Sequence, residues 1–347
     1  MITTRTGGAT LSRFGRQSSS PFVVGHRGMG MNRRPGAGGS PVLENTLLSF
    51  SLAAAAGADL LEFDVQVTRD GIPVVFHDDF LVRERASSVA EEASSSQQAD
   101  EPPALERLRI RDLTLAEFRA ARRRLWRRCT VEGAMYKWVP EVSDELPTLR
   151  ELYEKLPPHV GFNIELKTDE HAVPRGAELE AYIDAILGVS REFHSSSRRV
   201  FFSSFDPEVA LAMRLAQEQQ PVLLLTDAAE DGPHADPRRN SIAAAIDFVR
   251  ANRLDGVVAE VSALLQESHH VDELHASGLL IMTYGTANVD PQLAVLQAGW
   301  GVHAIITDHV ESVKGGLTSL QSRAAAYIRR PVAAAASAAR PVAIPAK

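Results

Sequence analysis

The stretch from Val23 to Asp79 reads VVGHRGMGMNRRPGAGGSPVLENTLLSFSLAAAAGADLLEFDVQVTRDGIPVVFHDD. Within these 57 residues lie side chains that can transfer protons, bind a metal ion or pair with a phosphate, namely His26, Arg27, Glu44, Glu62, Asp64 and His77. No other part of the chain is so dense in such groups. The functional site is therefore expected to be built mainly from this stretch.

The local pattern predicts a strand, a helix and a second strand. The run from Phe22 to Gly25 is apolar and ends in glycine, which is typical of a short buried strand. Asn45 can cap a following helix, and Gly57 supplies its left-handed stop. Glu44 is therefore expected just outside a helix N-terminus, beside the residues that follow the first strand.

The second strand is expected from Leu60 to Val67. Its period-2 alternation places Glu62 and Asp64 on one face and Leu61, Phe63 and Val65 on the other. A turn at Arg69-Asp70-Gly71 favours a tight hairpin, so residues 72–76 run back antiparallel and return His77 to the level of Asp64. One hairpin thus brings two acids and a histidine together.

Several of these motifs together resemble the glycerophosphodiester phosphodiesterase family in order and approximate spacing. They are His26-Arg27-Gly28, Glu44-Asn45-Thr46, Glu62-Phe63-Asp64-Val65, the Thr68 to Gly71 turn before Val74 to Asp78, Asn163-Ile164-Glu165-Leu166-Lys167 and Ser203-Ser204-Phe205-Asp206. The resemblance spans roughly residues 22 to 310 and loosens after Leu225. The sequence departs from the family at Leu81 to Arg85, and it has Tyr284 where many members carry a tryptophan.

Composition is that of an ordinary globular protein. The chain has 347 residues, of which 44% are hydrophobic and 23% charged, and no apolar run is long enough to span a bilayer. Cys129 is the only cysteine, which excludes an intrachain disulfide and favours a reducing compartment. Although the net charge is -7, residues 1–43 and 312–347 each hold six basic residues and no acid, so the body between them is strongly acidic. No global charge for nucleic-acid binding is present.

The fold class we predict is α/β, a (β/α)8 TIM barrel with a β-hairpin and a helical or loop insertion after the second barrel strand. Residues 1–20 are expected to be a disordered or targeting segment, 21–320 the barrel domain with residues 80–150 inserted, and 321–347 a low-complexity tail. Eight strands alternate with helical stretches, at 22–25, 60–66, 161–166, 199–204, 221–225, 255–259, 279–283 and 303–307.

Inside the insertion, Arg83 to Pro103 is polar and of low complexity, which predicts a flexible surface loop. Thr114 to Glu117 is a capping-box sequence that opens a helix, and a second capping box stands at Thr148 to Glu151. The basic run of residues 122–128 is interpreted as the solvated face of the first of these helices. Its alternative is contact with an anionic membrane or with RNA.

A third acid joins the first two if the barrel forms. The C-terminal ends of parallel barrel strands meet at one face, so Glu165 from the third strand reaches Glu62 and Asp64. Three uncompensated carboxylates repel one another, and Mg²⁺ or Ca²⁺ is the natural partner for them. The alternative is a cluster held by salt bridges alone.

The family resemblance implies roles for the remaining residues. His26 and His77 would be the catalytic pair that takes and gives protons. Arg27 and Lys167 would bind phosphoryl oxygens or else form salt bridges to the same acids, while Glu44 would orient Arg27 or join the metal ligands. Phe205 and Tyr284 would contact the substrate, with simple packing as the alternative for Tyr284.

The resemblance also implies an activity, the metal-dependent hydrolysis of glycerophosphodiesters such as glycerophosphocholine and glycerophosphoethanolamine to sn-glycerol 3-phosphate and an alcohol, in glycerophospholipid catabolism and phosphate recycling. The alternatives are cleavage of intact phospholipid and a noncatalytic barrel that binds ligands. The expected partner is this small-molecule substrate, with no nucleic acid and no integral membrane segment. Residues 1–20 weakly resemble a transit peptide, so cytoplasm or plastid is the expected compartment.

Overall fold

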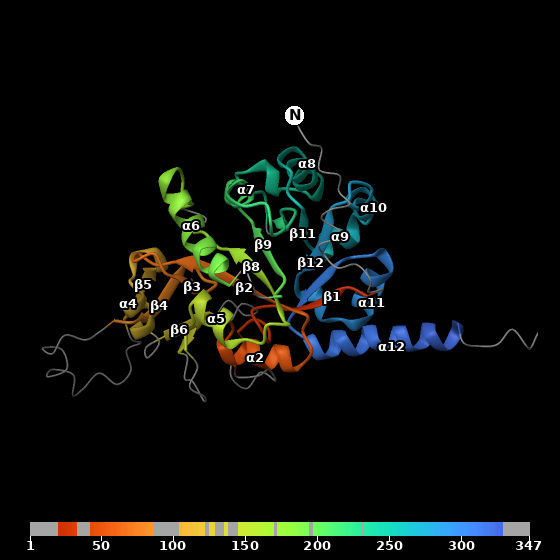
Figure 1. Ribbon diagram of the computed structural model, residues 1–347, viewed down its shortest axis with the longest axis horizontal. Coiled ribbons are helices and arrows are strands. Elements are labelled where there is room, and N and C mark those ends of the chain that lie inside the picture. Colours follow the sequence, from red (N-terminus) through yellow and green to blue (C-terminus); the bar gives the residue numbers. More distant parts are fainter. Residues whose placement is uncertain are drawn as a thin grey trace, which may run out of the picture.

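The computed structural model describes residues 20–32, 42–85, 104–121, 125–128, 135–137, 145–169, 172–193, 197–230 and 232–328. Residues 1–19, Cys129, residues 86–103 of the predicted loop and the end of the tail lie outside this part of the chain. The first residues of that predicted loop, Arg83 and Glu84, belong to strand β4 (Phe80–Glu84), so the loop prediction is wrong for them. Eight parallel strands close into a barrel because β1 (Phe22–Gly25) pairs with both β2 (Leu60–Val67) and β13 (Ala304–Thr307). The (β/α)8 prediction is therefore confirmed (Figure 1).

The other barrel strands follow in chain order around the barrel, and each begins within one residue of its expected start. They are β8 (Gly161–Leu166), β9 (Val200–Ser204), β10 (Val222–Thr226), β11 (Gly256–Glu260) and β12 (Leu280–Tyr284). The predicted hairpin is also present, since β3 (Pro73–Val75) pairs antiparallel with β2 in the register Val65 to Val75. The amide of Phe76 donates to the Asp64 carbonyl at 2.9 Å, so the hairpin returns the chain to the level of that acid.

Helices cover the outside of the barrel. They are α2 (Leu47–Ala55), α5 (Leu149–Lys155), α6 (Ala177–Glu192), α7 (Pro207–Ala216), α8 (Ile242–Asn252), α9 (Val261–Gln266), α10 (His269–Ala276), α11 (Pro291–Trp300) and α12 (Val310–Ile328), with short 3-10 turns η3 (Pro237–Arg239) and η4 (Thr286–Val289). None of the helices in the described ranges is long and apolar enough to cross a membrane. The last of them, α12, passes the boundary expected at residue 320 and continues to Ile328.

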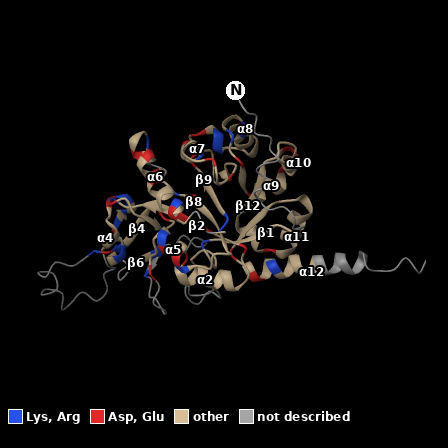
Figure 2. Ribbon diagram, in the orientation of Figure 1, with Lys and Arg blue, Asp and Glu red and all other residues tan. Residues whose placement is uncertain are grey.

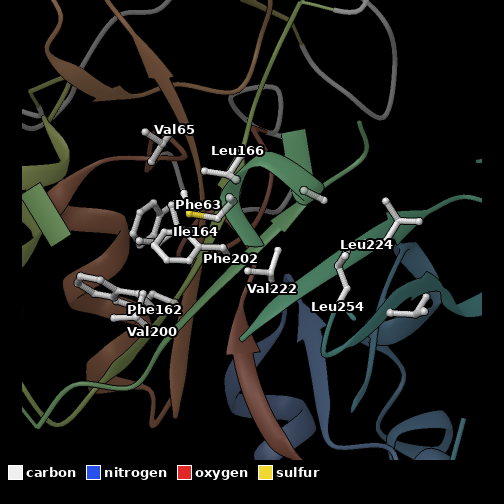
Figure 3. Close-up of a cluster of buried hydrophobic side chains, with 14 of the residues drawn as sticks. Phe63, Val65, Phe162, Ile164, Leu166, Val200, Phe202, Val222, Leu224 and Leu254 are labelled. Carbon is white, nitrogen blue, oxygen red and sulfur yellow. The ribbon is translucent and has the colours of Figure 1, made fainter. Parts of the chain in front are cut away.

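Two apolar layers hold the barrel together. The larger lies between strands and helices and receives one face of every barrel strand, as Phe63, Phe162, Ile164 and Phe202 illustrate (Figure 3). The smaller fills the barrel interior with Leu60, Phe201, Leu223, Val258 and Met282, among others. The alternation predicted for β2 is confirmed, because Leu61, Phe63 and Val65 belong to the outer layer and leave Glu62 and Asp64 to the interior.

The insertion contains an antiparallel sheet that the sequence analysis did not predict. Its four strands are β4 (Phe80–Glu84), β5 (Leu105–Arg109), β6 (Leu125–Arg128) and β7 (Met135–Lys137), in the order β5-β4-β6-β7. With η1 (Ile110–Asp112) and α4 (Leu115–Ala121) they enclose a third apolar cluster around Phe76, Leu81 and Phe118. In Figure 1 this unit lies beside the barrel, next to α5 and α6.

The helix caps predicted from the sequence are present except at one position. Both capping boxes are present, with Thr114 bonded to Glu117 and Thr148 bonded to Glu151. The cap of α2 is Thr46, whose hydroxyl accepts from the Ser49 amide, so the assignment to Asn45 is wrong by one residue. Asn45 instead has a φ of 58° and turns its side chain toward the barrel interior.

Candidate active site

A cavity of about 380 Å³ opens at the C-terminal ends of the barrel strands. Active sites of this fold are built at this face because the loops that follow the strands converge there. The cavity is lined by most of the residues expected at the site, namely His26, Arg27, Glu62, His77, Glu165, Lys167, Phe205 and Tyr284. Asp64 does not line the cavity but lies next to Glu62 and Glu165, which do. Glu44 is buried and contacts Arg27.

The three predicted metal ligands are brought together. Glu62 and Asp64 leave the interior face of β2, and Glu165 leaves the neighbouring strand β8, where it is in register with Asp64. Carboxylate oxygens of the three side chains all lie within 4.8 Å of one another, and all three residues are buried. The amide of Arg27 donates to Glu62 at 3.0 Å, and the Asn45 side chain donates to Asp64 at 2.9 Å.

The pKa values of two acids in this cluster, Glu62 and Asp64, are shifted in opposite directions. Burial, together with the negative charges of Asp64 and Glu165, raises the pKa of Glu62 to about 8. Burial also opposes ionisation of Asp64, yet nearby His77 and Arg27 hold its pKa well below the ordinary range. Asp64 Oδ1 is buried and accepts no hydrogen bond from the described residues. A negative cluster with an oxygen left over in this way has the chemistry of a divalent-cation site.

The loop after β1 carries two site residues in a constrained backbone. Arg27 has a φ of 47°, an unusual value for a residue with a side chain, and Gly28 follows at 90°. A methyl group at Gly28 would overlap the Ser49 hydroxyl at the start of α2, so only glycine allows this approach. The loop thereby turns the Arg27 guanidinium toward Asp64, at 3.6 Å, while His26 lines the cavity.

Both histidines are oriented by carboxylates that the sequence analysis did not single out. His26 Nδ1 lies 2.7 Å from Asp308 Oδ1, just beyond β13, and His77 Nδ1 lies 3.0 Å from Asp78 Oδ1. A carboxylate only accepts, so each ring donates through Nδ1 and presents Nε2 to the pocket. Two features of the sequence could have identified these carboxylates. Asp308 directly follows the last barrel strand, and Asp78 directly follows His77.

The two rings nevertheless differ in basicity. Burial lowers the pKa of His26, but the hydrogen bond and charge of Asp308 outweigh it and raise the value above normal. Burial and the positive charges of Arg27 and Lys167 lower the pKa of His77. Its Nε2 lies 3.2 Å from Lys167 Nζ, which can only donate, so Nε2 carries a lone pair.

Arg27 and Lys167 both line the cavity. Each also forms a salt bridge to a site acid, which the sequence analysis gave as the alternative to binding phosphate. Lys167 Nζ lies 3.3 Å from Glu165 Oε1, and Arg27 Nη1 lies 3.2 Å from Glu44 Oε1. Their pairing with buried acids does not use all of their donors. Each cation can therefore hold its place against the carboxylates and still offer N–H groups to an anion in the cavity.

The insertion reaches the site through Arg127. Residues 125–128 form strand β6, so the interpretation of the basic run as a solvated helix face is wrong for this part of it, while residues 122–124 lie outside the described ranges. The Arg127 side chain is buried over the Phe76 ring, at 4.6 Å from the centroid, and donates to Glu44 Oε1 at 2.6 Å. Glu44 is held between Arg127 and Arg27 and so joins the insertion to the loop after β1.

Substitution Arg127→Met is expected to lower the free energy of unfolding by about 3 kcal/mol, because it leaves the buried Glu44 with half of its ionic partners. Chemical denaturation of the purified protein measures this loss. Arg150→Met, which removes an exposed partner of Glu192, is the matched control and should cost much less. Equal stability of the parent and Arg127→Met would contradict the role given to this ion pair.

Phe205 and Tyr284 pack against each other in the wall of the cavity. Their ring centroids are 5.8 Å apart at an interplanar angle of 84°, an edge-to-face contact. Both rings are only partly buried and line the cavity, so Tyr284 packs against Phe205 and is also open to a ligand.

Known proteins resemble this chain over most of its length. The model of the "Glycerophosphoryl diester phosphodiesterase family" matches residues 26–312. A chloroplastic glycerophosphodiester phosphodiesterase of Arabidopsis thaliana is 35% identical over 311 residues, which cover 86% of this chain and 81% of the relative. A glycerophosphocholine phosphodiesterase of Candida albicans is 33% identical over 87% of this chain but only 29% of its own length. Among solved structures, a phosphodiesterase of Oleispira antarctica in complex with the product sn-glycerol-3-phosphate has a TM-score of 0.59 at 22% identity, covering 87% of this chain and 100% of that one.

Proposed function

This chain belongs to the glycerophosphoryl diester phosphodiesterase family, and from that premise we propose that it hydrolyses water-soluble glycerophosphodiesters to sn-glycerol 3-phosphate and an alcohol. Glycerophosphocholine and glycerophosphoethanolamine are the substrates that we name, and glycerophospholipid catabolism with phosphate recycling is the corresponding pathway role. One observation carries the proposal: three carboxylates lie within 4.8 Å of one another, and two of them, Glu62 and Glu165, line a cavity together with two histidines and two cations.

The carboxylate cluster fits a hard divalent cation such as Mg²⁺ or Ca²⁺. Its donors are all oxygens, and Asp64 Oδ1 is buried without a hydrogen-bond partner among the described residues. Glu62, Asp64 and Glu165 are the residues that would hold the ion. When bound, such a cation would polarise a phosphoryl oxygen and balance the negative charge of the cluster.

The chain's own cations would bind the phosphate. Arg27 and Lys167 lie on the two sides of the carboxylate cluster, and each has N–H donors beyond those used in its ion pairs. Charge-assisted hydrogen bonds from these groups would hold the phosphoryl oxygens and stabilise the charge that develops on them. Glu44 and Arg127, which do not line the cavity, would act by fixing the position of Arg27.

The histidine pair would move the protons. One ring accepts the proton of the attacking hydroxyl group as the new P–O bond forms, and the other donates a proton to the headgroup oxygen as its bond to phosphorus breaks. Asp308 and Asp78 fix each ring with Nε2 toward the cavity. The attacking group is either the glycerol 2-hydroxyl, giving a cyclic phosphate that water then opens, or water itself, and both routes consume one water per diester.

Turnover of glycerophosphocholine is expected to exceed turnover of phosphatidylcholine in vesicles by at least about a hundredfold, because a lipid substrate needs an apolar surface around the cavity mouth. A second hollow adjoins the cavity and shares His77, Glu165, Lys167 and Phe205 with it. Of the large hydrophobic side chains exposed in the described ranges, only Met135 lines the cavity or this hollow. Assays of both substrates with the purified full chain measure the ratio. Comparable rates would favour the alternative, a phospholipase that acts on intact lipid.

The other alternative, a noncatalytic binding barrel, would be expected to have lost a residue of the family's motifs, whereas His26, His77, Glu62, Asp64 and Glu165 are all present. For the compartment we keep the proposal of cytoplasm or plastid. The Arabidopsis relative is named as chloroplastic, and residues 1–19 of this chain are basic and rich in hydroxyl side chains. Imaging of the full chain fused at its C-terminus to a fluorescent protein, in plant cells, tests this proposal.

A further inference from the structure

The wall of the cavity opposite the carboxylate cluster has a chemistry of its own. It is formed by the ends of β10, β11 and β12, which lie across the barrel from β1, β2 and β8 in the strand order. Asp227 and Glu230 follow β10, Glu260 ends β11 and Tyr284 ends β12, and all four line the cavity. This wall does not belong to the proposed metal or proton-transfer sites.

The wall is negative and lacks a cationic counterpart. Among the residues that the structure describes, Arg27 and Lys167 are the only lysine or arginine residues that line the cavity, and both lie at the carboxylate cluster. Glu260 is buried and caps the start of α9, where its oxygens accept from the Ala263 amide at 2.9 Å, from the Ser262 hydroxyl at 3.3 Å and from the Ser262 amide, all of which are neutral donors. Among the described residues no cation pairs with Glu260 or Glu230, whereas Asp227 pairs with His234 at 2.8 Å.

The position of Glu260 depends on the glycine that follows Tyr284. Gly285 has a φ of 118°, and a methyl group there would overlap Glu260 Oε1. The carboxylate is therefore pressed against the loop after β12 and fixed at the cavity wall by its bonds to the start of α9. Burial, with the charge of Glu230 added, raises the pKa of Glu260, which means that this acid lacks the compensation a nearby cation would give.

An aromatic ring stands beside these acids. Burial, together with the charges of Asp227 and Glu260, raises the pKa of the Tyr284 phenol, so this ring lies in a negative field. Lys167 and Arg239 already lie over the Phe205 ring, at 5.9 and 5.6 Å from its centroid. No lysine or arginine in the described ranges lies over Tyr284, which is in edge-to-face contact with Phe205 and is partly exposed in the cavity.

We propose that this wall, made of Glu260, Glu230, Asp227 and Tyr284, binds a positively charged alkylammonium headgroup such as choline or ethanolamine. A phosphodiester held at the carboxylate cluster would extend one of its two alcohol groups across the cavity toward this wall, and carboxylates beside an aromatic ring are an arrangement that recognises an ammonium group. The headgroup would supply the positive charge with which Glu260 pairs. This inference rests on the proposed function and adds to it the residues that would select the headgroup.

The test compares glycerophosphocholine with the 3,3-dimethylbutyl ester of sn-glycerol 3-phosphate, which has the same shape but no charge on its headgroup. In the parent, kcat/KM for the choline ester should exceed that for the neutral ester about 10- to 30-fold. Glu260→Gln keeps the acceptor for the Ala263 amide and should reduce this ratio about fivefold. Tyr284→Leu should reduce it about fivefold as well.

Glu154→Gln, an exposed acid on α5, is the matched control and should leave the ratio within twofold of the parent. A parent ratio near one, or ratios that neither variant changes, would overturn the proposal. If the parent cleaved neither ester, the proposed function would fail, and calorimetric titration with phosphocholine and with 3,3-dimethylbutyl phosphate would then judge the wall by itself. Tighter binding of phosphocholine, lost in Tyr284→Leu, supports it, and equal affinities overturn it.

Discussion

Replacing His26 or His77 by alanine is expected to lower kcat by about 10²- to 10⁴-fold, the usual contribution of a positioned proton-transfer group. Both rings line the cavity beside the carboxylate cluster, and a carboxylate on Nδ1 orients each of them. Neither ring belongs to the apolar clusters that hold the fold, so the variants should fold normally. Steady-state kinetics on glycerophosphocholine, with circular dichroism as the check on folding, measure the effect.

His159→Ala provides the matched control. His159 is exposed in the turn before β8, at the opposite end of the barrel from the cavity, so its removal should leave kcat near the parental value. Near-parental activity of His26→Ala and His77→Ala would remove the histidine pair from the mechanism. A second comparison, Asp308→Asn, should fall between the control and His26→Ala, because the ring stays in place but loses its charged orienting partner.

Glu165→Gln is expected to weaken the binding of Mg²⁺ or Ca²⁺ by about tenfold or more, because it removes one of three anionic ligands and keeps the shape of the side chain. Isothermal titration calorimetry of the metal-free parent and variant measures the two affinities. In the parent, addition of the metal should also raise Tm by mass action, since the folded chain binds the ion and the unfolded chain does not.

Glu154→Gln makes the same chemical change at an exposed position and should bind the metal as the parent does. If the affinities of Glu165→Gln and parent were equal, Glu165 would not be a ligand. If the parent bound neither ion, the cluster would be held by its salt bridges to Arg27, Lys167 and His26 alone.

Much of the barrel could be predicted from the sequence because its signals are local. Each strand is a short apolar run, and buried parallel strands need no long-range information to be recognised. The metal-ligand candidates on β2 follow from alternation, and Glu165 follows from the rule that parallel strands end at one face. The hairpin that returns His77 was visible in its Asp-Gly turn.

What the sequence did not indicate depends on tertiary contacts. The basic run looked like a helix face because arginines at close spacing are usually solvated, but Arg127 is buried by its pairing with Glu44, 83 residues earlier in the chain. The insertion strands are short and carry many charged residues, seen around α4 and β6 in Figure 2, so their alternation is weak. Asp308 and Glu260 became site candidates only when the barrel closed and set their strand ends around one cavity.

We propose that this member of the glycerophosphoryl diester phosphodiesterase family hydrolyses its substrates only with a bound divalent cation. The measurement that tests it most directly is the release of sn-glycerol 3-phosphate from glycerophosphocholine by the purified full chain, assayed with Mg²⁺, with Ca²⁺ and with EDTA. We expect release with at least one of the two ions, none in EDTA, and recovery when the ion is restored in excess over the chelator. Full activity in EDTA, or no release with either ion, would contradict the account.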